Sequence, residues 1–421
     1  MKINKKIAVL IITTFMVLSF LILPVRADGT WQNAQIDTSM NAYRWISIAV
    51  DPSGNPHIAY ADTYGQLKYA SWTGAAWNIE SVGTININGG FLSLVLDSSG
   101  NPHIAYSSAQ QIGYISGTNV QGTSWTSPQT VASCSGLAYF GFPSLALDSN
   151  GNPAISYLVY GPSPCQIKYA HWTGSAWAIS SAATLTGSPY AAWTSLAFDQ
   201  AGTPHIAYED MNGAYLDYAT LVSGSWTVTQ IANTDPTGIS LGFNPISGNA
   251  ALSYYDGNGN LEFATQTGSQ WSIQTVDSGC GASQATSLAF DPRNGNPAIA
   301  YFDSSDNGGD LRYAYLSSGT WDIQVADQVS YLQADLPSST GYSASLAFDS
   351  SGAPHIAYCE NYFDEDEYDY YYYTMYTVGT PANTGIFNLP ESPLGTIMAL
   401  AVSLIALVAF ACIQKKKGRI I

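Results

Sequence analysis

Two loops of the chain are rich in the oxygen-bearing side chains that bind hard metal ions. One reads DGNGNLE from position 256, and the other reads DSSDNGGD from position 303. Carboxylate and amide oxygens clustered in Gly-rich turns are typical ligands of calcium. Tight turns also favour Asp, Asn and Gly for backbone reasons alone, so a purely structural interpretation stays open. The candidate calcium ligands are Asp256, Asn258, Asn260, Asp303, Asp306 and Asp310.

Aromatic residues occupy one position in four successive copies of a sequence repeat, whereas three later copies carry Gly238, Ala285 and Ser343 there. Aromatic ring faces offer a broad flat contact for a sugar or another apolar ligand. The alternative is that the rings close a channel or pack beneath neighbouring loops, because aromatic side chains usually bury area first. Asp62 and Asp210 follow the second strand of their repeats. With acidic residues at the equivalent position of other repeats they form an incomplete ring of carboxylates on the face of the fold that carries the aromatic residues. The predicted ligand-binding residues are Trp45, Phe91, Phe142, Trp193, Tyr43, Tyr190, Asp62 and Asp210.

These candidates are positioned by a repeat, SLAFDSSGAPHIAY from Ser345, that occurs seven times. Apolar residues alternate with small ones before an Asp-x-x-Gly turn, and a Pro opens the segment that follows it. This pattern predicts a β-hairpin. The turn residues recur 45 to 58 positions apart, a period typical of propellers and solenoids. They are Asp51, Asp97, Asp148, Asp199, Asn244, Asp291 and Asp349.

Two further strands follow in most copies, one resembling LKYASW and one that begins at a Trp. Four antiparallel strands make a propeller blade. Repeat seven has no Trp-led strand behind it, while Trp31 precedes repeat one with no hairpin of its own. The sequence therefore predicts an all-β, seven-bladed β-propeller in which the N-terminal strand completes the last blade. We call the face with the loops leading into the first strands the entry face.

The two ends of the chain differ from the repeats. Residues 1–27 have a basic start, an apolar run and a small residue at Ala27, which predicts a signal peptide. Residues 28–378 are the predicted propeller, and 379–393 form a Pro/Gly/Thr-rich stalk. Residues 394–413 lack any charge and are long enough for a transmembrane helix, and the basic tail 414–421 predicts a cytoplasmic C-terminus. A cell-surface location follows, with the propeller outside a single membrane span.

Charge and cysteine content narrow the chemistry further. All 30 acidic residues lie in the region 28–392, which contains five Lys and Arg in total, so nucleic acid is not an expected partner. Four histidines share one repeat position a blade apart, which favours a structural role over zinc binding. In an exported protein cysteines can pair. We predict a Cys134–Cys165 disulfide within blade three and, as the remaining pair, Cys280–Cys359.

The SLAxDxxGxPHIAY repeats resemble those of exported propeller proteins described as sialidase-like or BNR/Asp-box-like. The resemblance covers Thr30 to Val378 and implies the fold. Sialidases grip a carboxylate with three arginines, whereas Arg44, Arg293 and Arg312 fall on different parts of the predicted blade. The C-terminus, LPESP followed by an apolar helix and a basic cluster, resembles archaeosortase- and exosortase-type sorting signals.

Three hypotheses about function follow from these features. The first is a surface-anchored recognition module that binds a glycan, peptide or protein partner on its entry face, with calcium as an optional stabiliser and no certain cofactor. The second is a glycan-active enzyme that uses entry-face carboxylates. The third is a structural cell-envelope protein. A fold of this kind hosts many functions, so only the site can distinguish them.

Overall fold

The computed structural model describes residues 31–37, 42–62, 64–87, 90–108, 110–134, 139–161, 164–185, 193–210, 214–281, 285–305, 309–328, 339–364 and 369–382. The chain from Trp31 to Pro381 forms one compact unit. Within the described ranges no helix has the length and apolar character that crossing a bilayer requires. The predicted signal peptide and the predicted membrane span lie outside these ranges.

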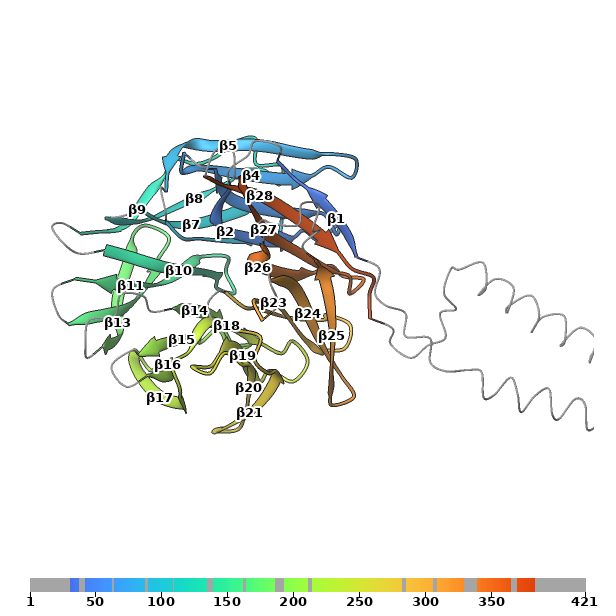
Figure 1. The fold of residues 1–421 in the computed structure, drawn as a ribbon. Helices are drawn as coiled ribbons and strands as arrows, with labels where there is room; N and C mark the ends of the chain where they lie inside the picture. Colours follow the sequence, from blue (N-terminus) through green and yellow to red (C-terminus); the bar gives the residue numbers. More distant parts are fainter. Residues whose placement is uncertain are drawn as a thin grey trace, which may run out of the picture. The chain divides into compact units, whose positions relative to one another are not determined.

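The described residues form seven four-stranded antiparallel sheets arranged as the blades of a β-propeller (Figure 1). This confirms the predicted fold class. From the inner strand outward, blades one to four are β2 (Ala42–Val50), β3 (Pro56–Asp62), β4 (Gln66–Trp72), β5 (Trp77–Asn86); β6 (Leu92–Leu96), β7 (Pro102–Ser108), β8 (Gln111–Ser116), β9 (Gln129–Ser133); β10 (Tyr139–Leu147), β11 (Pro153–Tyr160), β12 (Cys165–Trp172), β13 (Trp177–Leu185); and β14 (Thr194–Phe198), β15 (Pro204–Asp210), β16 (Tyr215–Val222), β17 (Ser225–Asn233). Blades five to seven are β18 (Thr237–Phe243), β19 (Ala250–Tyr255), β20 (Leu261–Thr267), β21 (Gln270–Asp277); β22 (Ser287–Phe290), β23 (Pro297–Asp303), β24 (Asp310–Ser317), β25 (Thr320–Asp327); and β26 (Ser339–Phe348), β27 (Pro354–Asp364), β28 (Asp369–Val378), β1 (Gln32–Gln35).

The ring closes as the sequence predicts, through the N-terminal strand. Strand β1 pairs antiparallel with β28, and Figure 1 shows the first strand of the chain beside the last. Trp31 then packs edge-to-face on Tyr313 of blade six, with ring centroids 5.1 Å apart. A Trp of every blade makes the same contact with a Tyr or Phe of the preceding blade, at 5.1–5.3 Å. The seven pairs are Trp31–Tyr313, Trp77–Tyr376, Trp125–Tyr69, Trp177–Tyr114, Trp226–Tyr169, Trp271–Tyr218 and Trp321–Phe263.

A ring of serine hydroxyls links the inner strands around the channel. The hydroxyl of the Ser that opens each repeat accepts a hydrogen bond from a backbone N–H in the inner strand of the next blade. The donor is the residue directly after the equivalent Ser, as Leu241 N–H donates to Ser195 Oγ at 2.9 Å. The last blade joins the first in the same way, because Ile48 N–H donates to Ser345 Oγ at 3.1 Å. This bond explains why the repeat keeps a polar residue in a buried layer. The seven acceptors are Ser47, Ser93, Ser144, Ser195, Ser240, Ser287 and Ser345.

Replacing Ser195 by Ala is expected to lower the free energy of unfolding by about 1–3 kcal/mol, since a buried N–H then loses its acceptor. Chemical denaturation measures the change. Ser225→Ala on the exposed start of β17 is the control and should shift stability by less than about 0.5 kcal/mol. Equal stability of the Ser195 variant and the wild type would contradict a stabilising role for the serine ring.

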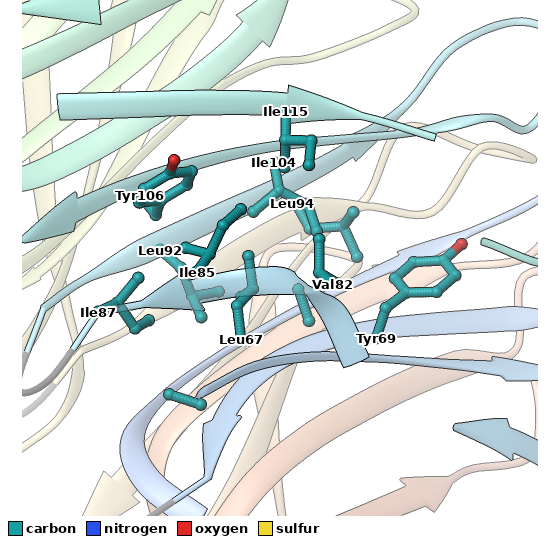
Figure 2. Packing of buried hydrophobic residues seen from close by; sticks show 12 residues of the cluster. Leu67, Tyr69, Val82, Ile85, Ile87, Leu92, Leu94, Ile104, Tyr106 and Ile115 are labelled. Carbon is teal, nitrogen blue, oxygen red and sulfur yellow. The ribbon is translucent and has the colours of Figure 1, made fainter. Parts of the chain in front are cut away.

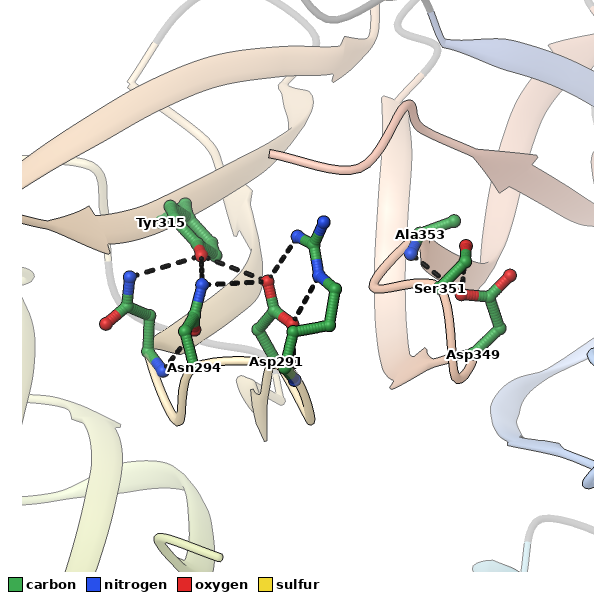
Figure 3. A network of polar contacts seen from close by, with 8 residues as sticks. Asp291, Asn294, Tyr315, Asp349, Ser351 and Ala353 are labelled. Atoms are coloured by element: carbon green, nitrogen blue, oxygen red, sulfur yellow. Dashed lines mark hydrogen bonds and ion pairs between the residues drawn. The ribbon is translucent and has the colours of Figure 1, made fainter. Parts of the chain in front are cut away.

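The Asp-x-x-G turns are held by the Asp side chain, as the repeat pattern indicates. Asp51 Oδ1 accepts the N–H groups of Ser53 and Asn55, both at 2.8 Å, and Gly54 closes the turn at a φ of 86°. Figure 3 shows the corresponding turns of blades six and seven, at Asp291 and Asp349. In blade six Arg293 also pairs with Asp291 at 2.6 Å. The turn carboxylates therefore serve the fold.

The repeated histidines also belong to this turn structure. His57 Nδ1 lies 2.7 Å from the Tyr69 hydroxyl, and Nε2 lies 3.4 Å from Asp51. Burial lowers the pKa of His57, although the neighbouring carboxylate opposes this effect. Blade three has Ala154 at the His position, and there His171 of β12 supplies the ring that contacts Asp148 at 3.0 Å. Each contact lies within one blade, which accounts for the histidines without a shared metal ion.

The hydrophobic core lies between neighbouring blades. Figure 2 shows the cluster between blades one and two, in which Leu67 and Val82 of one blade meet Leu94 and Ile104 of the next. The second strand of each blade is buried on both faces, as in β3 and β23. Each blade therefore depends on its neighbours for burial of its apolar surface.

Candidate functional site

The entry end of the central channel contains a cavity of about 180 Å³. Residues at the start of the inner strands line it. Trp45, Phe91, Phe142 and Trp193 come from blades one to four, and Ala285 and Ser343 come from blades six and seven. The sequence comparison of equivalent positions therefore identified residues that the fold brings to one place, although they are about 50 positions apart in the chain.

The four aromatic side chains pack on one another. The ring centroids of Phe91 and Phe142 are 3.9 Å apart, those of Trp45 and Phe91 are 4.2 Å apart, and those of Phe142 and Trp193 are 4.7 Å apart. Trp45 and Trp193, from blades one and four, are in edge contact at 5.6 Å. The four aromatic residues predicted from the repeats thus form a single half-buried cluster, the aromatic wall of the cavity. The packing of the rings on one another agrees in part with the alternative that they close the channel. The cavity beside the rings still leaves room for a ligand.

Bulges in the inner strands hold this wall in place. The register of β10 against β11 shifts between Gly141 and Ser144, and Phe142 has a φ of 51°. A left-handed backbone is rare for a bulky residue and costs about 1–3 kcal/mol. The Thr194 hydroxyl of the next blade donates to the Phe142 carbonyl at 2.8 Å and contacts Ser156. Neighbouring blades therefore stabilise a strained conformation that directs the Phe142 ring into the cavity.

The rest of the cavity lining is small and polar. Serines of the inner hydrogen-bonded ring, including Ser144, Ser195 and Ser287, also line the cavity. Each hydroxyl accepts one backbone N–H and retains its own proton to donate. Among the described residues that line this cavity there is no Asp, Glu, Lys, Arg, His or Cys. The arrangement suits a small neutral ligand with one apolar face and several hydroxyl groups.

Asp62 and Asp210 do not line the cavity, in contrast to the predicted grouping with the aromatic residues. Both end second strands, one layer outward from the channel. The Asp62 carboxylate accepts the N–H groups of Tyr64 and Gln66 at 3.0 and 2.8 Å, so it stabilises its own turn. Of the other two predicted ligand-binding residues, Tyr43 falls within β2 and Tyr190 lies outside the described ranges.

The structure accounts for most candidate calcium ligands as parts of turns. Asp256 Oδ1 accepts the N–H groups of Asn258 and Asn260, both at 2.9 Å, and its Oδ2 accepts their side-chain amides. Asp303 is paired with Arg312 at 2.7 Å, and Asp310 faces it across the hairpin. Asp306 lies outside the described residues. Among those that are described, no three His, Cys, Asp or Glu side chains gather as metal ligands.

The structure forms neither predicted disulfide. Cys134 follows the outer strand of blade two, and its Sγ contacts the Gln110 carbonyl at 3.7 Å. Cys165 begins β12 in blade three and is buried in the apolar cluster between blades three and four. Cys280 and Cys359 are buried in blades five and seven, where their sulfurs contact backbone carbonyls. Cys134 and Cys165 are near each other in the sequence, but they belong to blades two and three. Cys280 and Cys359 likewise belong to different blades, so neither predicted pair of thiols comes together.

Glu209 of β15 is a buried carboxyl that the sequence analysis missed. Its side chain is 3% exposed, and Oε2 accepts the backbone N–H of Trp193 at 3.4 Å. Burial raises the pKa of Glu209 to about 8, and the negative charge of Asp235 contributes in the same direction. A signal was present in the repeats, because the equivalent positions are apolar or uncharged. They are Ala61, Ser107, Leu158, Tyr255, Phe302 and Cys359.

Neither a family model nor a curated protein matches the chain. Among solved structures, AofleA from Arthrobotrys oligospora is similar at 13% identity and a TM-score of 0.50, covering 72% of this chain and 91% of that chain. The fucose-specific lectin from Aleuria aurantia is 15% identical with a TM-score of 0.48, covering 69% and 96%. The leech intramolecular trans-sialidase is 9% identical with a TM-score of 0.46, covering 78% and 90%. At these identities the likeness concerns the fold alone.

Proposed function

We propose that this chain is a cell-surface recognition module that binds a neutral glycan in the channel cavity. The observation that carries the proposal is the uncharged cavity with an aromatic wall, in which Phe142 is held at a φ of 51°. Strained residues persist where the surrounding structure stabilises them, and they concentrate at binding sites.

The chemistry of the two walls supports a sugar as the ligand. A pyranose ring presents C–H groups on its faces and hydroxyl groups at its edge. The faces can pack on Trp45 and Trp193, while the edge can exchange hydrogen bonds with the serine hydroxyls. The cavity of about 180 Å³ suits one sugar unit and not a long chain.

Binding is favoured over catalysis because, among the described residues, no Asp, Glu, His, Lys or Cys lines the cavity, so its serine hydroxyls have no base beside them in that lining. The Glu209 carboxyl lies behind Trp193 and outside this lining. The propeller fold occurs both in a fucose-specific lectin and in a trans-sialidase, so the fold does not decide the question. Export and anchoring form part of the proposal and rest on the apolar run at 394–413 and the basic residues that follow it.

Trp45→Ala is expected to weaken glycan binding about tenfold or more, because one ring of the wall is lost. The full chain, purified in a detergent without a sugar headgroup, would be applied to an array of neutral and charged glycans. Trp172→Ala is the matched control, since Trp172 packs on Trp177 at the blade periphery and does not line the cavity. Absence of binding by the wild type, or equal binding by both variants, would favour a structural role for the aromatic cluster.

A further inference from the structure

Polar side chains of two second strands hold the backbone of two residues of the aromatic wall. Phe91 N–H donates to Ser107 Oγ at 2.9 Å, and Ser107 N–H donates to the Phe91 carbonyl at 2.8 Å. Trp193 N–H donates to Glu209 Oε2 at 3.4 Å, and Glu209 N–H donates to the Trp193 carbonyl at 3.2 Å. Phe91 and Trp193 come directly before the inner strands β6 and β14. The two side chains therefore fix the chain at the point where each ring enters the cavity lining.

Serine and glutamate are exceptional at this position of the repeat. Ser107 and Glu209 both follow the Tyr of the second strand, and they are 1% and 3% exposed. Buried polar side chains are nearly always hydrogen-bonded. In both blades the bonded group is the backbone of a ring that lines the cavity. The other five blades carry Ala61, Leu158, Tyr255, Phe302 and Cys359 at this position.

Glu209 is linked to a second ring of the aromatic wall through Thr194. Thr194 directly follows Trp193, and its hydroxyl donates to the Phe142 carbonyl at 2.8 Å. Phe142 has a φ of 51°, so the direction of its ring depends on the contacts that hold its backbone. A shift of the chain at Trp193 would move Thr194 as well. One carboxyl therefore supports rings of two neighbouring blades.

The carboxyl of Glu209 is a costly acceptor for this place. Burial raises the pKa of Glu209 to about 8, although the hydrogen bond from Trp193 opposes this effect. Ser107 makes the corresponding bond in blade two without an ionisable group. Titratable groups with strongly shifted pKa values concentrate at functional sites.

We infer that Ser107 and Glu209 are positioning residues of the aromatic wall, whose side-chain oxygens fix the backbone of Phe91 and Trp193 so that the rings are preformed for a sugar to stack on. Neither residue lines the cavity, so both act through the rings. A site held in its binding geometry beforehand loses less free energy to ordering when a ligand arrives. This inference rests on the proposed glycan-binding function and adds to it the residues on which the affinity depends.

The test replaces each positioning residue by one that the fold already accepts at the same place in another blade. Glu209→Leu introduces the residue type of Leu158 in blade three, and Ser107→Ala introduces that of Ala61 in blade one. Both variants should therefore fold without the acceptor, while Glu209→Gln keeps an acceptor and lacks the charge. Glu262→Leu is the matched control, since Glu262 is a buried, hydrogen-bonded carboxyl of β20, 7% exposed, that does not line the cavity.

Two measurements would be made at pH 8 on the full chain in a detergent without a sugar headgroup. Methyl glycosides of glucose, galactose, mannose and fucose would be titrated calorimetrically into each variant. Fluorine NMR of the chain labelled with fluorotryptophan would report the surroundings of the Trp193 ring without any ligand. The Trp193 resonance would be assigned by its loss in Trp193→Phe.

We expect Glu209→Leu and Ser107→Ala each to weaken the tightest glycoside about tenfold, and Glu209→Gln and Glu262→Leu to stay within about twofold of the wild type. The Trp193 resonance should shift in Glu209→Leu and keep its position in Glu209→Gln. Leucine also removes a buried carboxyl, so Glu209→Leu should be no less stable at pH 8 than the wild type. Weaker binding would then not be a consequence of unfolding.

Equal affinity of the wild type, Glu209→Leu and Ser107→Ala would overturn the positioning role, and a loss in Trp45→Ala alone would leave the glycan proposal standing. An equal loss of affinity in Glu209→Gln and Glu209→Leu would also overturn it, because the hydrogen bond would not be the cause. If no glycoside binds the wild type, the glycan proposal fails. An unchanged Trp193 resonance in Glu209→Leu would then overturn the positioning role as well.

Discussion

Replacing Trp31 by Ala is expected to destabilise the propeller by about 3 kcal/mol, the low end of the usual effect of removing a packed Trp, because this ring is half-buried. Trp31 contacts Tyr313 of blade six, and its Nε1–H donates to Gln324 Oε1 at 3.3 Å. It also precedes β1, the strand that pairs with β28 and joins the two ends of the ring. The substitution therefore weakens both packing and closure.

Trp271→Ala is the control that separates these two contributions. Trp271 makes an equivalent contact with Tyr218, at 5.1 Å, but between blades that are consecutive in the chain. Thermal unfolding should show a lower midpoint for both variants. Hydrogen exchange should be faster in β28 only for Trp31→Ala, since β1 then separates more readily from β28. Unchanged protection of β28 in the Trp31 variant would show that β1 stays paired without its Trp.

Replacing Glu209 by Gln is expected to stabilise the protein at pH 8 by about 4 kcal/mol and to have little effect at pH 4. Burial raises the pKa of Glu209 from about 4.5 to about 8. The folded state therefore binds a proton that the unfolded chain releases above pH 4.5. The stability contributed by the protonated carboxyl is fully present below that pH and is lost as the pH rises toward 8, at about 1.36 kcal/mol per pH unit.

Glutamine removes this pH dependence and retains an oxygen that can accept the Trp193 N–H. Other groups also titrate, because burial raises the pKa of Glu360 to about 7 and that of Asp217 to about 6. The informative quantity is thus the difference between variant and wild type, measured by chemical denaturation from pH 4 to pH 8. Glu80→Gln, on the outer strand β5, is the matched control for the exchange of a carboxylate for an amide. An equal difference at pH 4 and pH 8 would contradict a buried, protonated Glu209.

The repeat made the fold predictable because each copy of the motif meets the same neighbours. Three residues of the repeat each have one structural role that recurs around the ring: the Trp that precedes or starts the outer strand, the Ser at the start of the inner segment, and the Asp or Asn of the turn. An unpaired Trp31 was therefore enough to predict closure by the N-terminal strand. The aromatic residues were recognisable as candidates because four copies departed from the other three at one position.

The roles of the acidic residues and cysteines were decided by the tertiary structure. Asp62 and Asp256 resemble ligands in the sequence, but their oxygens accept backbone N–H groups of their own turns, which is a matter of local hydrogen-bond geometry. Cys134 and Cys165 are near in the sequence, but they lie in different blades.

The sequence by itself determined the number of blades, the strand order and the shared position of the four aromatic residues at the start of the inner strands, because these follow from periodicity. Only the tertiary structure decided that four rings pack on one another and that Glu209 is buried with its carboxylate accepting the Trp193 N–H. The reason is physical: these properties depend on contacts between residues that are far apart in the chain, such as Phe91 with Phe142 or Glu209 with Trp193, and such contacts form only when the strands and blades pack together.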